Sequence, residues 1–261
     1  MNWSLAFAIA RRDLRGGIRG FRVFLSCLAL GVAAIAGVGS LADAIVNGLR
    51  VEGRSILGGD MEFRFVQRAA DPKESDFIAG IGPISHVVEL RAMARALAGD
   101  GRTIIELKAI DSRYPLVGAV TLDPVMNLHS ALAAVDGKFG FVAESSLVER
   151  LNLKPGDMIH IGNLDAEYRA TLAAEPDKLS GGLNAGPRVM ISADALADTG
   201  LMQLGSLANH AYRILIGPKD QVAPLREAAN AAFPQAGWRI REASESSPQI
   251  KSFVEDRKSV V

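Results

Sequence analysis

The side chains best suited to chemistry are scattered along this sequence rather than grouped. There are four histidines, and none of them shows the spacing of paired metal ligands: His86, His129, His160 and His210. Neither a G-x-S-x-G nucleophile motif nor an H-E-x-x-H zinc motif occurs. We interpret the histidines at 160 and 210 as packing or surface residues of strands. The sequence therefore predicts no catalytic residue, no metal site and no bound cofactor.

One glycine-rich segment, Leu179–Pro187, invites comparison with nucleotide-binding motifs. Its first four letters, LSGG, match the start of the LSGGQ signature of transport ATPases. The phosphate loop G-x-x-x-x-G-K-[ST] that accompanies that signature is absent. We interpret the segment as a flexible loop. Carboxylates such as Glu144, Glu149 and Asp157 fit solvated faces and turns.

The segment Val23–Ala42 contains twenty residues without a charge. This is close to the ~20 residues that a helix needs to cross a hydrocarbon core of roughly 30 Å. Three interpretations compete: a buried core helix, a secretion signal cleaved after Ala42, and a permanent membrane anchor. A core helix rarely stays uncharged for so long, and the apolar region of a signal is typically ~7–15 residues. The pattern favours a permanent anchor, which we place at residues 23–46.

Basic residues before the apolar segment predict its orientation. Five arginines stand against the single acidic residue Asp13: Arg11, Arg12, Arg15, Arg19 and Arg22. Because positively charged flanks stay on the cytoplasmic side, these arginines place the N-terminus in the cytoplasm. Everything after the anchor then lies outside the cytoplasm.

Small residues recur every four positions along the anchor. One row contains Ala29, Ala33 and Gly37, and a second row passes through Ser40. Rows of this kind let a second membrane helix approach closely, so these four residues are candidates for helix packing. The alternative is that small residues are simply common in membrane helices.

Helical segments are expected on both sides of the anchor. Residues 1–22 place their apolar side chains on one helical face beside the arginines, which predicts a cytoplasmic amphipathic helix. Residues 47–59 continue a period near 3.6, and Gly58-Gly59 supplies the stop. We expect residues 47–59 to form a helical stalk.

The amino-acid composition limits the classes of protein to which the chain after the anchor can belong. The sequence has 29 basic and 29 acidic residues, so no excess charge points to nucleic acid. Cys27 is the only cysteine, which excludes an intramolecular disulfide and a cysteine metal site. The region after the anchor must therefore be held together by its core.

Residues 60–250 mix strand and helix patterns without a regular βαβ order. Strands are expected at 61–66, 86–94, 103–110, 158–161, 167–172 and 238–242 and within GPRVMIS and HAYRILIG, with helices at 73–79, 145–151, 193–199 and 222–233. A hairpin turn is expected at Asp100-Gly101. This arrangement predicts an α+β domain of mixed sheets and helices with two lobes.

Four motifs carry a family resemblance that runs from about Ala8 to Phe253. They are ARRDLRGG at the leader, ILGGDMEFRF at the stalk end, ELKAIDSRYPLVG at Glu106–Gly118, and LVERLNLKPGDMIHIG. Together they resemble permease subunits of the MacB-like and FtsX-like ABC transporter superfamily. Within it, the chain looks most like the large tandem permeases associated with lysophospholipase L1.

The resemblance implies a role. Residues 60–250 would form a MacB-like periplasmic core domain, anchored in a bacterial inner (plasma) membrane. A separate cytoplasmic ABC ATPase would drive the non-catalytic permease, and the stalk would relay its motion. Lipid-like or amphipathic substrates, membrane lipids and a periplasmic partner protein are implied as well. The alternatives are a single-pass anchored interaction module without transport activity and a secreted enzyme with a cleaved signal.

The end of the sequence departs from the family, whose members carry further membrane helices after the outer domain. Residues 251–255 look like the approach to a second membrane helix. The last six residues, DRKSVV, match the translation of GATCGGAAGAGCGTCGTG, the sequence of a common sequencing adapter. We therefore expect residues 251–261 to be a truncated approach, with a non-native tail at 256–261. The alternative is an ordinary frayed terminus.

Overall fold

The structure is a computed structural model that describes residues 22–40, 48, 52–178, 186–203, 205–217 and 222–245. It divides into two compact units, Met1–Gly48 and Leu49–Val261. The expected leader helix before residue 22, most of the expected stalk, the LSGG segment and the expected tail lie outside the described residues.

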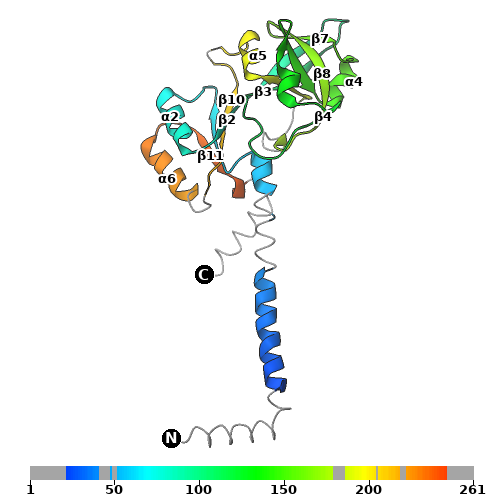
Figure 1. Cartoon of the computed structure of the whole chain (residues 1–261). Coiled ribbons are helices and arrows are strands. Elements are labelled where there is room, and N and C mark those ends of the chain that lie inside the picture. Colours follow the sequence, from blue (N-terminus) through cyan, green and yellow to red (C-terminus); the bar gives the residue numbers. More distant parts are fainter. Residues whose placement is uncertain are drawn as a thin grey trace, which may run out of the picture. The chain divides into compact units, whose positions relative to one another are not determined.

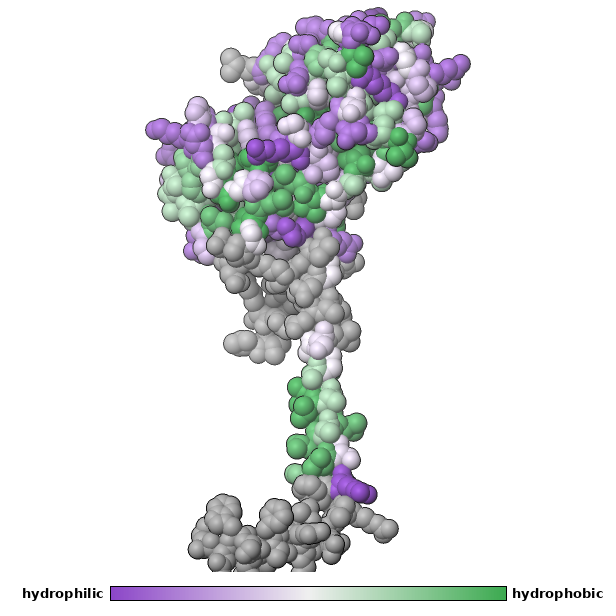
Figure 2. Space-filling model, viewed as in Figure 1, coloured by the Kyte–Doolittle hydropathy of each residue, from purple (hydrophilic) through white to green (hydrophobic). Residues whose placement is uncertain are grey.

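The described part of the first unit is a helix from Arg22 to Ser40. It has 19 residues and a mean hydropathy of 2.1, and none of its most apolar window is buried. At 1.5 Å per residue it is about 28 Å long, close to the thickness of a hydrocarbon core. Figure 2 shows apolar side chains along this helix. By length and composition it can cross a membrane.

The second unit is built on one sheet, which has eleven strands among the described residues. In chain order these are β1 (Met61–Val66), β2 (Ile84–Ala96), β3 (Arg102–Ile110), β4 (Thr121–Asp123), β5 (Ala134–Val135), β6 (Lys138–Ala143), β7 (Met158–Ile161), β8 (Leu164–Ala174), β9 (Arg188–Ser192), β10 (Asn209–Ile214) and β11 (Arg239–Glu242). The spatial order is β11-β1-β10-β2-β3-β9-β6-β8-β4; β5 pairs with β6, and β7 pairs with β2 and β8.

Besides the helix at 52–57, several short helical elements accompany the sheet among the described residues. They are α2 (Pro72–Ile81), α3 (Leu128–Leu132), α4 (Ser145–Leu151), α5 (Ala193–Asp198), α6 (Val222–Ala232) and the 3-10 turn η3 (Ala243–Glu245). Figure 1 shows two lobes, with α2 and α6 in one and α4, β7 and β8 in the other. The antiparallel pair β2 and β3 belongs to both lobes, because β2 pairs with β10 along its first half and with β7 at its end.

One face of the sheet is apolar and covered by helices. In the first lobe, Phe63 and Tyr212 pack with Ile78 of α2 and Ala229 of α6. In the second lobe, the same face of β2 and β3 packs against residues of α4, α5, β7 and β8. A smaller apolar cluster on the opposite face joins β6, β8 and β9 to α3. These three clusters hold the lobes together without a disulfide.

The expected α+β domain is confirmed, and so are most of its elements. The strand at 61–66 and the helix at 145–151 have the predicted bounds. The turn at Asp100-Gly101 joins β2 and β3, where the Ala96 N–H donates to the Gly101 carbonyl at 2.8 Å. The pair β7–β8 forms across Gly162-Asn163 as expected, although β8 begins at Leu164 rather than 167.

A stack of aromatic rings lies on the covered face between β2 and β10. The ring of His86 lies parallel to that of Tyr212, with centroids 4.3 Å apart, and its Nε2 is 3.1 Å from Nδ1 of His210. Burial lowers the pKa of His86 to about 4, helped by His210 and opposed by the carboxylate of Asp111. Both histidines therefore serve packing here, and His160 lies at the surface beside Asp165.

The lowered pKa of His86 makes stability depend on pH. Between pH 6.5 and about 4 the unfolded chain binds a proton that the folded chain does not, so stability falls as the pH drops through this window. The span of pKa values corresponds to about 3 kcal/mol. We predict that His86→Gln flattens this part of the curve of unfolding free energy against pH. His129→Gln on α3 is the control, and an equal slope in both variants would contradict the assignment.

Candidate functional site

A row of alternating charges crosses four strands on the face opposite the aromatic stack. The register places Arg241 of β11 beside Glu62 of β1, and Glu62 beside Arg213 of β10. The side chains follow the register, since Glu62 lies 3.5 Å from Arg241 and 3.3 Å from Arg213. Ser85 of β2 continues the row and donates to Asp111 at 2.7 Å. Opposite charges directly across strands stabilise the pairing.

A second set of charged residues continues on β2, β3 and β9. Glu89 is opposite Lys108, and Glu106 is opposite Arg188. The guanidinium of Arg188 lies 3.3 Å from Glu89 and 3.3 Å from Glu106. Arg64 of β1 reaches Glu89 at 3.7 Å and so connects the two sets. These ion pairs form a continuous layer across the middle of the sheet, on the face opposite the aromatic stack.

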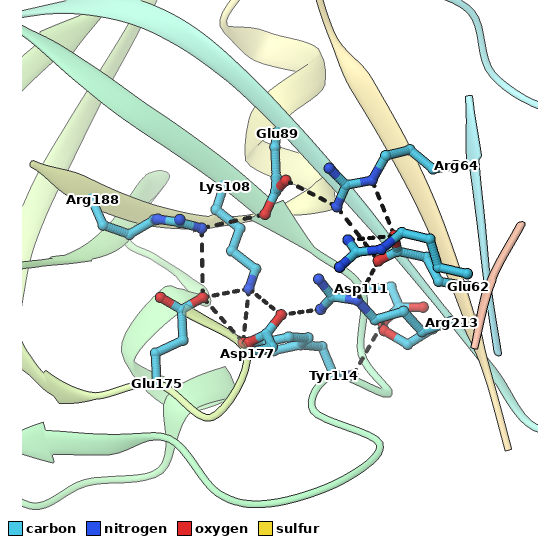
Figure 3. Close-up of polar contacts among 12 residues, drawn as sticks. Glu62, Arg64, Glu89, Lys108, Asp111, Tyr114, Glu175, Asp177, Arg188 and Arg213 are labelled. Atoms are coloured by element: carbon cyan, nitrogen blue, oxygen red, sulfur yellow. Dashed lines mark hydrogen bonds and ion pairs between the residues drawn. The ribbon is translucent and has the colours of Figure 1, made fainter. Parts of the chain in front are cut away.

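Two carboxylates from the segment after β8 complete this buried charge network. Lys108 points between Glu175 and Asp177 and forms ion pairs with both (Figure 3). Asp177 also pairs with Arg213 and accepts a hydrogen bond from the Tyr114 hydroxyl. Tyr114 lies in the loop after β3, and its ring is 4.4 Å from the Lys108 ammonium. The loop after β3 and the segment after β8 are therefore both tied to Lys108, and Asp177 also ties the second of them to Arg213.

Burial and neighbouring charges have opposite effects on the pKa values of Asp177 and Arg213, and the neighbouring charges together have the larger effect. Burial alone would raise the pKa of Asp177, but Arg213, Lys108 and the hydrogen bonds hold that pKa well below its ordinary value. Burial and the neighbouring carboxylate raise the pKa of Tyr114. Arg213 keeps its charge, because Asp177 and Glu62 raise its pKa against the effect of burial. Asp177 is thus ionised and Tyr114 is neutral at pH 7.

This arrangement is suited to holding segments in place rather than to catalysis. Each charge of the network faces an opposite charge, which leaves no general base or nucleophile poised for a substrate. Among the residues that the structure describes, no group of three His, Cys, Asp or Glu side chains could hold a metal ion. The described contacts of the network hold segments of the chain in fixed positions.

The helix that enters the domain ends against this network. Residues 52–57 are helical, and the N–H groups of Gly58 and Gly59 both donate to the Arg54 carbonyl, at 2.8 and 3.1 Å. Gly58 has a φ of 78°, a left-handed conformation that favours glycine. A Cβ at this position would lie 3.0 Å from Cδ of Arg213. The helix end is thus packed directly on a buried arginine of the network.

The helix that enters the domain and the last described turn, η3, meet at one place. The Asp60 carbonyl accepts from Ala243 of η3 at 3.0 Å, and the Asp60 N–H donates to Ile214 at 2.8 Å. The Asp60 carboxylate pairs with Arg54 at 2.7 Å. A Cβ on Gly53 would overlap the carbonyl oxygen of Ala243. The entering helix and the last described turn therefore pack backbone against backbone.

The residues singled out in the sequence fall in three places. Arg22 begins the described apolar helix, and the four small packing candidates are exposed along it: Ala29, Ala33, Gly37 and Ser40. The other four arginines of the leader lie outside the described residues. The glycines at 58 and 59 follow the helix at 52–57. No described contact tests a packing role for the small residues.

Sequence reasoning missed the charge network. The alternation in 61–66 is typical of a half-buried strand, and it does not predict that the polar face of the strand is covered as well. Glu62 is fully buried, because the segment after β8 and the entering helix cover the polar face. The available signal was that Lys108 stands between Leu107 and Ala109, and Arg213 between Tyr212 and Ile214. Their partners Glu175 and Asp177 come from distant segments, which no local pattern identifies.

Comparison with solved structures gives the class of fold. The chain superposes on the periplasmic region of MacB from Actinobacillus actinomycetemcomitans with a TM-score of 0.50, covering 78% of this chain and 95% of that one at 10% identity. A second structure, the extracellular domain of the noncanonic ABC-type transporter YknZ from Gram-positive bacteria, matches 70% of this chain with a TM-score of 0.45 at 13% identity. The described domain is a mixed α+β domain that resembles the MacB periplasmic region, preceded by one apolar helix.

Comparison with curated sequences gives a distant relative. The chain is 25% identical over 186 residues, 71% of its length, to the uncharacterized ABC transporter permease YbbP of Escherichia coli. It spans 22% of the length of that relative. No protein-family model matches the chain. The chain is therefore distantly homologous to an ABC transporter permease.

The buried pairing of Lys108 predicts a large effect of removing its charge. Lys108→Met leaves Glu175 and Asp177 without their shared cation, which we expect to lower the free energy of unfolding by about 3–5 kcal/mol. Lys178→Met is the matched control, because that lysine pairs with Glu144 while half exposed and should cost less than about 1 kcal/mol. Denaturant unfolding followed by circular dichroism measures both. Similar losses in the two variants would show that the network does not stabilise the fold.

The contact between Gly58 and Arg213 predicts a second difference. Gly58→Ala places a Cβ in a left-handed conformation and against the arginine, whereas Gly137→Ala meets only the backbone cost, since Gly137 has a φ of 76° and nothing within 4 Å of its Cβ. The backbone term is about 1–2 kcal/mol in both. We expect Gly58→Ala to lower the melting temperature further than Gly137→Ala. Equal shifts would mean that Arg213 moves aside freely.

Proposed function

We propose that this chain is the first part of a permease subunit of an ATP-driven ABC transporter of the MacB and FtsX type. One observation carries the proposal: a membrane-length apolar helix precedes a domain whose fold resembles the MacB periplasmic region, in a chain distantly homologous to an ABC permease. The meeting of the entering helix with the last described turn supports it. A domain inserted between two membrane helices needs its two ends side by side.

The proposal extends to orientation and partners. The arginines before residue 23 support an N-terminus in the cytoplasm of a bacterial cell and a domain outside the inner (plasma) membrane. A separate cytoplasmic ABC ATPase would bind the permease and hydrolyse ATP, while this subunit catalyses nothing. The small-residue rows at Ala29, Ala33, Gly37 and Ser40 would pack against further membrane helices.

We propose that the charge network transmits the motion of the membrane helices to the domain. Motion of the membrane helices driven by the ATPase would reach the entering helix, whose end rests on Arg213 through Gly58. Because Arg213 shares Asp177 with Lys108, a displacement there would be passed to both lobes. The substrate would be lipid-like or amphipathic and would be exported or extracted from the membrane. An association with a lysophospholipase, as in the tandem permeases that the sequence resembles, belongs to the same proposal.

The partnership is tested by purifying the product of the complete gene from membranes together with candidate ABC ATPases of the same genome. We expect one ATPase to co-purify and to hydrolyse ATP faster in the complex than alone. A protein that binds no ATPase would instead be an anchored interaction module. The orientation is checked in the same cells, because a phosphatase that is active only outside the cytoplasm should be active when fused after Gly59, and an inactive fusion would contradict it.

A further inference from the structure

Strand β2 has a gap in its pairing at the junction of the two lobes. One edge pairs with β3 without interruption from Val87 to Arg95. The other edge pairs with β10 from Ile84 to Glu89 and with β7 from Ala94 to Ala96. Between these two stretches, residues 90–93 face no strand among the described residues. The gap is four residues long, or about 13 Å.

The hydrogen bonds at the end of β2 show which backbone groups point into the gap. The Ala96 N–H donates toward β3, to Gly101 at 2.8 Å, and the Leu97 N–H donates toward β7, to Met158 at 3.0 Å. Alternate residues of an antiparallel strand direct their N–H and C=O groups to the same edge. Since the register with β3 is unbroken, Arg91 and Met93 direct their backbone groups into the gap. No described residue hydrogen-bonds to them there.

A cavity of about 520 Å³ lies at this gap. It is lined by Leu90 and Arg91 of β2 and, across the gap, by Leu201, Ser206 and Leu207 of the segment between α5 and β10. A slot four residues long, one strand spacing of ~4.8 Å wide and one sheet spacing of ~10 Å deep has a volume of roughly 600 Å³. The cavity therefore has about the size of one short added strand.

The charged residues on the exposed face beside the cavity are mainly arginines. Glu89, Glu106 and Arg188 also line the cavity and belong to the buried network, where Glu89 pairs with Arg64 and Arg188, and Glu106 pairs with Arg188. Three exposed arginines on the same face of β2 and β3 form no ion pair with any described residue: Arg91, Arg95 and Arg102. Met93 and Ile104 are opposite one another between them and are 52% and 53% exposed. This face is cationic with an apolar centre.

We propose that the gap in β2 binds an extended segment of a partner protein that adds as a strand beside Arg91 and Met93. The backbone of the segment pairs with these two residues, as in other cases of strand addition. Its side chains alternate between two faces. Acidic side chains meet Arg91 and Arg95 on one face, and apolar side chains pack toward Leu90 and Leu201 on the other. The partner segment is therefore one in which acidic and apolar residues alternate. The proposal does not depend on transport.

The probe is a capped six-residue peptide in which valine and glutamate alternate, added to the full chain in lipid nanodiscs. Hydrogen–deuterium exchange resolved to single residues reports the pairing. Without peptide, the amides of Arg91 and Met93 should exchange faster than those of Leu90 and Ala92, which bond to β3. Saturating peptide should slow Arg91 and Met93 by at least about tenfold and leave their neighbours unchanged.

Two matched comparisons make the test specific. Arg91→Glu should weaken peptide binding by at least about tenfold, while Arg113→Glu, a reversal at an exposed arginine in a distant loop, should leave it unchanged. A peptide N-methylated on its pairing edge should not bind. The proposal is overturned if the N-methylated peptide binds equally well, or if no binding occurs up to about 1 mM. It is also overturned if both amides are already protected by pairing with a second copy of this chain.

Discussion

The ion pairs of Asp177 are the constraint on which the rest of the domain depends. This carboxylate lies between Lys108 and Arg213, and all three side chains are buried. A buried charge is tolerated only when its partners are held in place, so the positions of several segments are linked. Asp177 fixes the segment after β8, Tyr114 fixes the loop after β3, and Arg213 supports the end of the entering helix through Gly58. Displacing any one of them exposes the charges of the others.

Apolar packing stabilises one face of the sheet, and ion pairs connect the strands on the other face. The covered apolar face supplies most of the burial and joins helices to strands within each lobe. Apolar contacts are not directional, so they set the compactness of the lobes more than their register. Ion pairs on the opposite face have defined partners, and they run across β1, β10, β2, β3 and β9 in one layer. Under the proposed function, in which motion would reach the domain at one helix end and pass to two lobes, such a directional connection would be needed.

Local patterns predicted the elements well and their surroundings poorly. Period-two alternation located 61–66, and spacing located α4, because those signals arise within one element. The spacing in 222–233 predicts that Leu225, Ala228, Ala229 and Ala232 face inward. In α6, Leu225 and Ala229 do pack on the core, whereas Ala228 and Ala232 are exposed. The charge network needs partners nearly 70 residues apart, such as Lys108 and Asp177, and the gap in β2 depends on where β10 ends and β7 begins. Neither can be obtained from a single sequence by spacing.

We infer that the charge network holds the end of the entering helix on the sheet. Amide exchange at Gly58 reports on this contact, since that N–H bonds to the Arg54 carbonyl at 2.8 Å. Asp177→Asn keeps the shape of the side chain and removes the charge that Arg213 requires. We expect amide exchange at Gly58 and Gly59 to become at least about tenfold faster in this variant, while the amides of α4 keep their wild-type exchange rates. Unchanged exchange at both glycines would contradict it.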